Sequence, residues 1–389
     1  MAVETREAPA SGRCLVRNIG RLLTGDVAAP LADSDSLMIE DGVIAGFEAG
    51  DADREIDAGG CAVAPGLIDS HCHPVFGDWT PRQNQLGWIE MNVNGGVTSF
   101  LSAGEVHLPG RPKDAEGVKA LAMVAQRCFQ NFRPIGAKVI AGAPVPELDF
   151  DRDFYAGLKA AGIRHIGEIG LGTVAKGPDA ARVTGWCREI GIETIMHTGG
   201  PSIAGSHHVT AEDVLEAQPD VVSHINGGPT SIEHAAIREL CRHATGALEV
   251  VHNGNERSAI VALEAALAED RLADLLIGTD APAGSGVQPN GMLRMVALLA
   301  AFGGLPGELA WCCATGNVAR RRGLAQGILA PGRPADIVFM DRPAGSPGAD
   351  VLEALAMGNI PGIAAVMIDG KMRTARSRST PPAARVPAG

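Results

Sequence analysis

The chain lacks several common sequence signals. None of its eight cysteines form a C-x-x-C pair, so neither a zinc ribbon nor a thioredoxin-like site is indicated. No apolar run is long enough to span a bilayer, because the richest one, residues 292–302, contains Arg294 and stops at Gly303. The polar segment from Met1 to Gly12 has no apolar signal core. We therefore expect a protein of the reducing cytoplasm, with no membrane partner.

Positive charge is also scarce. The chain has 33 Lys and Arg against 45 Asp and Glu, and its net charge is −12. A chain this acidic is a poor candidate for general nucleic-acid binding, so we expect no nucleic-acid partner. An anionic substrate would need local Arg or Lys to overcome the overall negative field. A hydrophobic content of 46% and a charged content of 20% are those of an ordinary globular protein.

The length and the order of predicted elements indicate two domains. The 389 residues suit a barrel of roughly 250 residues plus a smaller domain. Short strands are predicted near both ends of the chain, and one β-domain assembled from both ends explains them. We predict a composite β-sandwich from residues 1–64 and 325–389, in which the tail from residue 373 lies against a surface or a neighbouring subunit. The predicted strands are residues 14–19, 36–39, 43–47, 335–340 and 362–369.

Residues 65–324 repeat one theme of apolar strand, polar loop and helix. Such alternation is typical of an α/β protein with a (β/α)8 TIM barrel. Eight strands are expected to end at Ile68, Leu101, Ala141, Ile169, Met196, Ser223, Val251 and Ile277. Helical patterns lie between them at residues 115–131, 180–190, 231–243 and 258–269.

The most informative segment is Ala-Pro-Gly-Leu-Ile-Asp-Ser-His-Cys-His at residues 64–73. His71 and His73 follow a predicted buried strand, and side chains two apart in a strand point the same way. Neutral imidazole is a common ligand for zinc and iron. The H-x-H pattern alone recurs by accident, so its meaning depends on the other strand ends.

Histidines and carboxylates occupy those other strand ends too. Glu168 ends strand four, His197 strand five, His224 strand six and Asp280 strand eight. Because the chemistry of a TIM barrel takes place at the carboxyl ends of its strands, these side chains should converge on one rim. The set suits two divalent ions bridged by Glu168. Asp280 could bind one ion while its other oxygen handles a proton, which makes it the candidate catalytic residue.

Each of these residues also has a simpler interpretation. His197 and His224 could be hydrogen-bonded core histidines. Glu168 could pair with Arg133, and Asp280 could cap a helix or start a turn. A chance arrangement of all six residues at matching strand ends would be rare, so we favour the metal site.

These residues resemble the amidohydrolase superfamily. The pattern covers nearly the whole chain, from residues 65–73 through the later histidines and Asp280 to residues 314–336. The resemblance implies an amidohydrolase-type TIM barrel and a metal-dependent hydrolase acting on the C–N bonds of cyclic amides. Many binuclear members carry a carboxylated lysine at the end of strand four. Glu168 stands there instead, which implies a glutamate bridge.

Within the superfamily, the chain most resembles the enamidases of nicotinate degradation. This resemblance implies that 6-oxo-1,4,5,6-tetrahydronicotinate is opened to 2-formylglutarate and ammonia, with zinc and iron as metals and a homotetramer as the assembly. The matching segments are residues 77–83, 102–104, 109–114, 167–173, 196–200 and 221–230.

The ligand set leads to a mechanistic hypothesis. Hydroxide formed between two ions would attack the lactam carbonyl, and Asp280 would carry its proton to the leaving nitrogen. His71, His73 and Asp280 would hold the more buried ion. His197 and His224 would hold the second ion, and Glu168 would bridge the two.

A substrate carboxylate would need a cation near this rim. The positively charged candidates lie in loops, where they could equally be solvated charges. The candidates that follow strand seven could hydrogen-bond the ring or only brace the loop. The full set of candidate substrate-binding residues is Arg82, His107, Arg111, Lys113, His252 and Asn255.

Two alternative functions stay open at this point. The same metal set would serve a dihydroorotase-, hydantoinase- or deaminase-like enzyme, and screening substrates for ammonia release would separate these. A non-catalytic scaffold of the same fold would be expected to lack metal ligands, whereas none is missing here.

Overall fold

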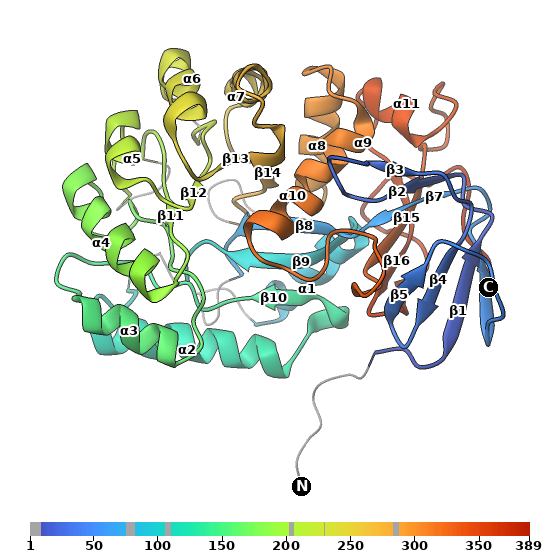
Figure 1. The fold of residues 1–389 in the computed structure, drawn as a ribbon, viewed down its shortest axis with the longest axis horizontal. Coiled ribbons are helices and arrows are strands. Elements are labelled where there is room, and N and C mark those ends of the chain that lie inside the picture. The colour runs from blue at the N-terminus through green and yellow to red at the C-terminus, as the bar shows by residue number, and fades with distance from the viewer. Residues whose placement is uncertain (1–8, 75–81, 106–109, 202–205, 229, 283–287) are drawn as a thin grey trace, which may run out of the picture.

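The computed structural model describes residues 9–74, 82–105, 110–201, 206–228, 230–282 and 288–389, without the side chains of residues 82–86. Figure 1 shows a barrel with its helices on one side of the molecule and a β-rich region on the other. None of the helices in these ranges has the length and apolar character needed to cross a membrane. All eight cysteines are unpaired, and seven of them are buried.

The β-rich region combines strands from both ends of the chain (Figure 1). One sheet has the order β5-β4-β1-β6, and the other has the order β17-β16-β15-β7-β2-β3. In the second sheet β15, from the end of the chain, pairs antiparallel with β7, from its beginning. The strands are β1 (Arg13–Arg17), β2 (Arg21–Leu23), β3 (Leu31–Ala32), β4 (Leu37–Glu40), β5 (Val43–Gly46), β6 (Arg54–Asp57), β7 (Ala62–Pro65), β15 (Ile337–Asp341), β16 (Gly362–Ile368) and β17 (Lys371–Thr374).

The C-terminal tail lies along this region. The backbone of Ala388 exchanges hydrogen bonds of 2.7 and 2.8 Å with Asp57 at the end of β6. Arg385 donates two hydrogen bonds, of 2.7 and 2.8 Å, to the carboxylate of Asp341 in β15. The tail therefore lies on a surface of its own chain. The domain boundaries after residues 64 and 324 stay a prediction.

Parallel strands form the barrel. They make two sheets, β10-β9-β8 and β11-β12-β13-β14. These sheets meet where the N–H of His73 donates to the carbonyl of Ala281 at 2.8 Å, so β8 lies beside β14. The strands are β8 (Leu67–Cys72), β9 (Val97–Ser102), β10 (Lys138–Ile140), β11 (Ile195–Met196), β12 (Val221–Val222), β13 (Ala247–Val251) and β14 (Leu275–Gly278).

The fourth strand position is occupied by an irregular segment, residues 165–169. His165 and Ile169 form isolated parallel bridges with the chain at β11, and the N–H of Glu168 donates to the carbonyl of Ala103 beyond β9. The eight positions therefore follow one another in chain order around a closed ring. The sequence predicted a strand end at Ile169. The backbone there forms no regular hydrogen-bond ladder, because the N–H of Gly167 donates to the carbonyl of Pro144 in the loop beyond β10.

The helices follow the predicted pattern, with ends set by capping. The predicted helix at residues 115–131 is α2, whose first turn is capped by Asp114. The helix predicted at 180–190 begins three residues earlier at Gly177, because Pro178 suits the first turn. The helices are α1 (Arg82–Asn94), α2 (Ala115–Asn131), α3 (Arg152–Ala160), α4 (Gly177–Ile190), α5 (Ala211–Ala217), α6 (His234–His243), α7 (Glu256–Ala268), α8 (Gly291–Ala301), α9 (Gly307–Cys313), α10 (Gly316–Arg321) and α11 (Val351–Ala356).

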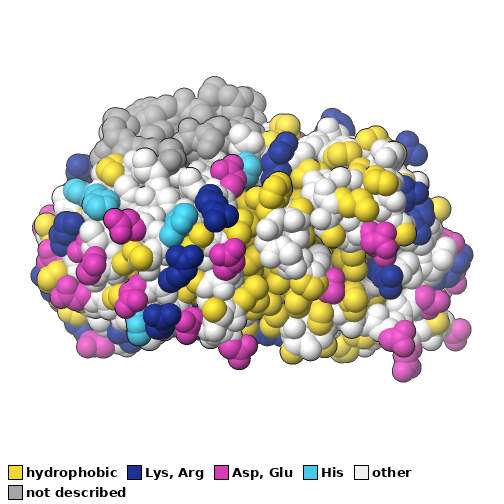
Figure 2. Space-filling view, turned by 90° about the horizontal axis from the view of Figure 1, so that it is seen from above, with side chains coloured by type: hydrophobic (Ala, Val, Ile, Leu, Met, Phe, Trp, Pro, Cys, Tyr) yellow, Lys and Arg dark blue, Asp and Glu magenta, His cyan; other side chains and the backbone are white. Residues whose placement is uncertain are grey.

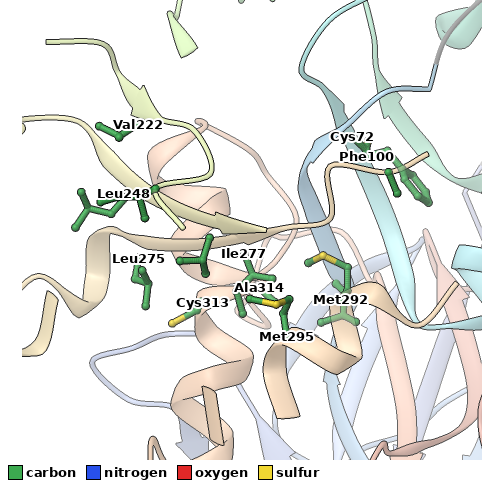
Figure 3. Close-up of a cluster of buried hydrophobic side chains, with 14 of the residues drawn as sticks. Cys72, Phe100, Val222, Leu248, Leu275, Ile277, Met292, Met295, Cys313 and Ala314 are labelled. Carbon is green, nitrogen blue, oxygen red and sulfur yellow. The ribbon is translucent and has the colours of Figure 1, made fainter. Parts of the chain in front are cut away.

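Two hydrophobic layers hold the barrel. The outer layer packs the strands against the helices, and Figure 3 shows Leu275 and Ile277 of β14 beside side chains of α8 and α9. The inner layer includes Ile195, Val221 and Ala247, which are the first residues of their strands. Apolar side chains thus fill the amino-terminal end of the barrel, which leaves the opposite end for polar groups.

Charge is mixed on the outside of the molecule. On the face in Figure 2, basic side chains lie among acidic ones over one half, and hydrophobic side chains gather in a band near the middle.

Candidate metal centre

A β-bulge at the end of β8 determines where its histidines point. The pairing of β8 with β9 shifts between Asp69 and Cys72, where β8 has one additional residue. Before the bulge Ile68 faces the inner layer, whereas beyond it Cys72 packs into the outer layer. His71 and His73 therefore both face the interior, with ring centroids 5.5 Å apart.

Glu168 lies between two histidines from different strands. One carboxylate oxygen is 2.8 Å from Nε2 of His224, which follows β12. The other oxygen is 3.6 Å from Nε2 of His71. His197, which follows β11, has its ring centroid 4.6 Å from that of His224. This arrangement lets each oxygen of Glu168 face a different half of the site.

Asp280 closes the site from the end of β14. Its Oδ1 lies 3.0 Å from Nε2 of His73 and 3.6 Å from Nε2 of His71. The structure therefore brings all six predicted ligands together, although their role as ligands stays a prediction. They form three overlapping groups, each with its ligand atoms within 4.8 Å of one another: His71, His224 and Asp280; His71, His73 and Glu168; and Glu168, His197 and His224.

The surroundings of His71 test whether a cation fits. Its Nδ1 is 2.7 Å from a carboxylate oxygen of Glu249, and an ionised carboxylate can only accept, so Nδ1 carries the proton. Nε2 is buried and has no hydrogen-bond partner in the described structure, so in the neutral ring it presents a lone pair. It faces oxygens of Glu168 and Asp280, each at 3.6 Å. Three electron-rich atoms facing one point suit a divalent cation.

Electrostatics favour the protonation state that a metal ligand needs for three of the six residues, Glu168, Asp280 and His197. Burial alone would raise the pKa of Glu168, but His71 and His224 hold it well below its usual value. Burial also opposes ionisation of Asp280, yet the hydrogen bond from His73 lowers the pKa of that carboxyl. Burial, aided by nearby His224, lowers the pKa of His197 to about 4. The acids stay ionised and His197 stays neutral, as ligands must be. In contrast, the nearby acids raise the pKa of His71 and of His224, so these two rings would have to release a proton to bind a cation.

Within the described residues, neither an ion pair of Glu168 with Arg133 nor a helix cap by Asp280 is found. Arg133, the alternative partner of Glu168, is 2.7 Å from Asp369 instead. No described helix begins at Asp280, which adopts a left-handed φ of 56° that is uncommon for residues other than Gly. The amide of Asn253 donates to the Asp280 carbonyl at 2.6 Å and holds this conformation.

The predicted substrate-binding residues, unlike the predicted metal ligands, are not all described by the structure, and those that are described differ in their burial. His107 and the side chain of Arg82 lie outside the described residues, although Arg82 begins α1. Nη2 of Arg111 is 2.5 Å from Glu147, and both side chains are buried. Lys113 is exposed in the loop before α2.

The two candidates beyond β13 differ in their contacts. His252 is half-buried, and its ring packs against the start of α8. A β-carbon added at Gly291, the first residue of α8, would lie 3.2 Å from that ring. The Asn255 side chain accepts a hydrogen bond of 2.9 Å from the Ser258 N–H, so it caps α7, and this contact braces the loop. Substrate binding by either residue stays a prediction.

Sequence reasoning missed two carboxylates that support the rim. Glu249 contacts His71 from β13. Asp69 accepts from both the N–H and the hydroxyl of Thr279, which ties β8 to β14, and burial raises the pKa of Asp69 to about 7. The available signal for Glu249 was a single acid inside an apolar predicted strand, and Asp69 directly follows the predicted strand end at Ile68, but neither signal identifies a partner.

A closed barrel with histidines and carboxylates at its carboxyl rim defines the class of metal-dependent barrel hydrolases. The family model described as "Amidohydrolase family" matches residues 62–373, and the chain belongs to that family. Membership makes the chain a metal-dependent hydrolase that acts on C–N bonds.

Individual proteins extend this finding. The chain is 42% identical to the enamidase of Eubacterium barkeri over 380 residues, which cover 96% of this chain and 98% of that protein. It matches the crystal structure of an enamidase with a TM-score of 0.91, covering 97% of this chain and 99% of that one. A dihydroorotase of Thermus aquaticus is 26% identical over 180 residues, or 43% of this chain and 41% of that protein.

Proposed function

We propose that this protein opens the lactam ring of 6-oxo-1,4,5,6-tetrahydronicotinate and yields 2-formylglutarate and ammonia. The observation that carries the proposal is the convergence of four histidines and two carboxylates on one rim. The near full-length similarity to an enamidase favours this substrate over those of other cyclic amidohydrolases. Dihydroorotase-, hydantoinase- and deaminase-type substrates then serve as comparison compounds.

The proposed ligands divide into two groups joined by Glu168. His71, His73 and Asp280 hold the more buried ion, and His197 and His224 hold the second. Support comes from Glu168, whose two oxygens face His71 and His224 separately. Divalent ions held there would polarise the lactam carbonyl and lower the pKa of a water molecule to about 7.

The chain's own residues would handle the proton and the charge. Asp280 accepts the proton of the attacking water and delivers it to the ring nitrogen as the C–N bond breaks. Its side chain is 14% exposed, whereas that of Glu168 is 3% exposed, so Asp280 can reach a bound substrate. The freed enamine nitrogen tautomerises to an imine, and water then releases ammonia.

A cation would hold the substrate carboxylate. Arg111 is a candidate because Glu147 fixes one of its nitrogens in a buried pair and so orients the guanidinium. Arg82, His107, Lys113, His252 and Asn255 complete the proposed substrate-binding set. We further propose zinc, iron or both as the metals, a homotetramer, and a cytoplasmic place in nicotinate degradation. The unpaired cysteines suit a reducing compartment.

Metal analysis combined with an activity assay tests this function. Purified protein is stripped with a chelator, reconstituted with zinc or iron, and assayed for ammonia release from 6-oxo-1,4,5,6-tetrahydronicotinate. We expect two ions per chain and faster turnover of this compound than of dihydroorotate or a hydantoin. Fewer than one ion per chain, together with no ammonia after reconstitution, would sink the proposal.

A further inference from the structure

Glu249 is a buried acid in the middle of an apolar strand. Its residue is 1% exposed, and its neighbours Leu248 and Val250 pack into the outer hydrophobic layer. Because side chains alternate along a strand, Glu249 faces the barrel interior together with Ala247 of the inner layer. An ionised acid in this place is costly unless positive charge and hydrogen bonds compensate it.

Both oxygens of Glu249 are used by consecutive residues of β8. One is 2.7 Å from Nδ1 of His71, and the other accepts a 2.5 Å hydrogen bond from the hydroxyl of Ser70. Adjacent residues of a regular strand point to opposite faces, so a single partner could not normally reach both. The bulge in β8 turns both side chains inward and makes this double contact possible.

Charge accumulates around His71 to an unusual degree. Oxygens of Glu249, Glu168 and Asp280 lie 2.7, 3.6 and 3.6 Å from its ring nitrogens. Glu168 and Asp280 belong to the proposed ligand set, whereas Glu249 is on the far side of the ring. A cation at Nε2 would draw electron density from the imidazole and so strengthen the hydrogen bond that Nδ1–H donates to Glu249. Such a cation would add to the stabilisation that Glu249 already receives from His71 and from the Ser70 hydroxyl.

We propose that Glu249 is a positioning residue that holds the proton of His71 on Nδ1 and thereby presents Nε2 as the metal-binding atom. The inference rests on the proposed metal site and adds a residue to it that no ligand pattern contains. Ser70 restrains the carboxylate, because its hydroxyl donates to the second oxygen. Among the proposed ligands in the described structure, Glu249 contacts His71, so we expect it to act through that residue.

Metal affinity, measured without substrate, tests the proposal. Metal-free protein is titrated with Co²⁺ or Zn²⁺ against a chelating indicator, and the visible absorption of bound Co²⁺ reports the geometry. Glu249→Gln keeps a hydrogen-bond acceptor for Nδ1 but removes the charge, so we expect affinity to fall about 10-fold. Glu249→Leu removes both, and we expect a fall of about 100-fold with an altered Co²⁺ spectrum.

Glu193→Gln is the matched control. Glu193 is also an acid in the barrel wall, where it pairs with Arg322 at 2.8 Å, and it contacts none of the proposed ligands. We expect it to change stability but not metal affinity. If the metal affinity of Glu249→Gln lies within twofold of that of the unsubstituted protein, the inference is overturned. This test holds even if Glu249→Leu fails to fold. If the unsubstituted protein itself binds no ion, the proposed function fails instead.

Discussion

Replacing Asp280 by Asn separates proton transfer from the fold, and the metal content of the variant is measured beside its activity. Asn has the same shape as Asp and tolerates the left-handed backbone at this position, where φ is 56°. The backbone is held independently of the side chain, because its N–H donates to the His71 carbonyl at 2.7 Å and its carbonyl accepts from Asn253 at 2.6 Å. We therefore expect the unfolding free energy to change by about 1 kcal/mol or less.

The activity of this variant should fall far more. An amide oxygen can still occupy the place of Oδ1, which lies 3.0 Å from Nε2 of His73. However, an amide cannot take a proton from water near neutral pH. General acid–base catalysis contributes about 10²- to 10⁴-fold, so we expect kcat for ammonia release to fall within that range, which corresponds to about 3 to 5 kcal/mol of activation free energy.

The assay compares kcat, metal content and thermal unfolding of both proteins. Asp270→Asn is the matched control, because Asp270 is exposed and has a similar φ of 54° far from the rim. It should behave like the unsubstituted protein. Near-normal kcat of Asp280→Asn at full metal content would refute the reasoning and place the proton carrier elsewhere.

Three further predictions follow from the same structure. Saturating zinc at about 1,000 times its Kd should stabilise the folded protein by about 4 kcal/mol, or about 5 °C in Tm for 389 residues by calorimetry, and an unchanged Tm would contradict a metal site. Burial and nearby Arg322 lower the pKa of His165 to about 3, so below about pH 6.5 only the unfolded chain takes up this proton. Stability should fall by about 2 kcal/mol between pH 7.5 and 5 on this account, and His165→Gln should show less of this loss in urea unfolding of metal-free protein. A β-carbon on Gly278 would lie 2.6 Å from that of His71, so Gly278→Ala should weaken metal binding at least 10-fold, and unaltered affinity would show that β8 can shift freely.

Local sequence signals predicted much of the fold because local chemistry determines those features. Asp114 and Asn255 cap α2 and α7 near the predicted starts, and a capping side chain acts on its own helix. The fourth barrel strand was predicted less well. Its glycines let the backbone bond to neighbouring loops, so residues 165–169 form bridges and no regular ladder.

The predicted ligands came from strand order, which also lies in the sequence. Alternation of strands and helices places every strand end at one rim, so His71 and Asp280 could be grouped without coordinates. The sequence pattern also predicted correctly that the side chains of His71 and His73 point the same way. The bulge that turns both inward was not predictable, because it arises where β8 must match the register of β9.

By itself, the sequence determined the alternating architecture, the residue types at the rim and the resemblance to the amidohydrolases. Only the tertiary structure decided which acid supports which histidine. Glu249 and His71 are 178 positions apart, and each oxygen of Glu168 faces a histidine from a different strand. Such partnerships depend on register and on side-chain direction at the closed ring, and both are set by contacts between distant segments.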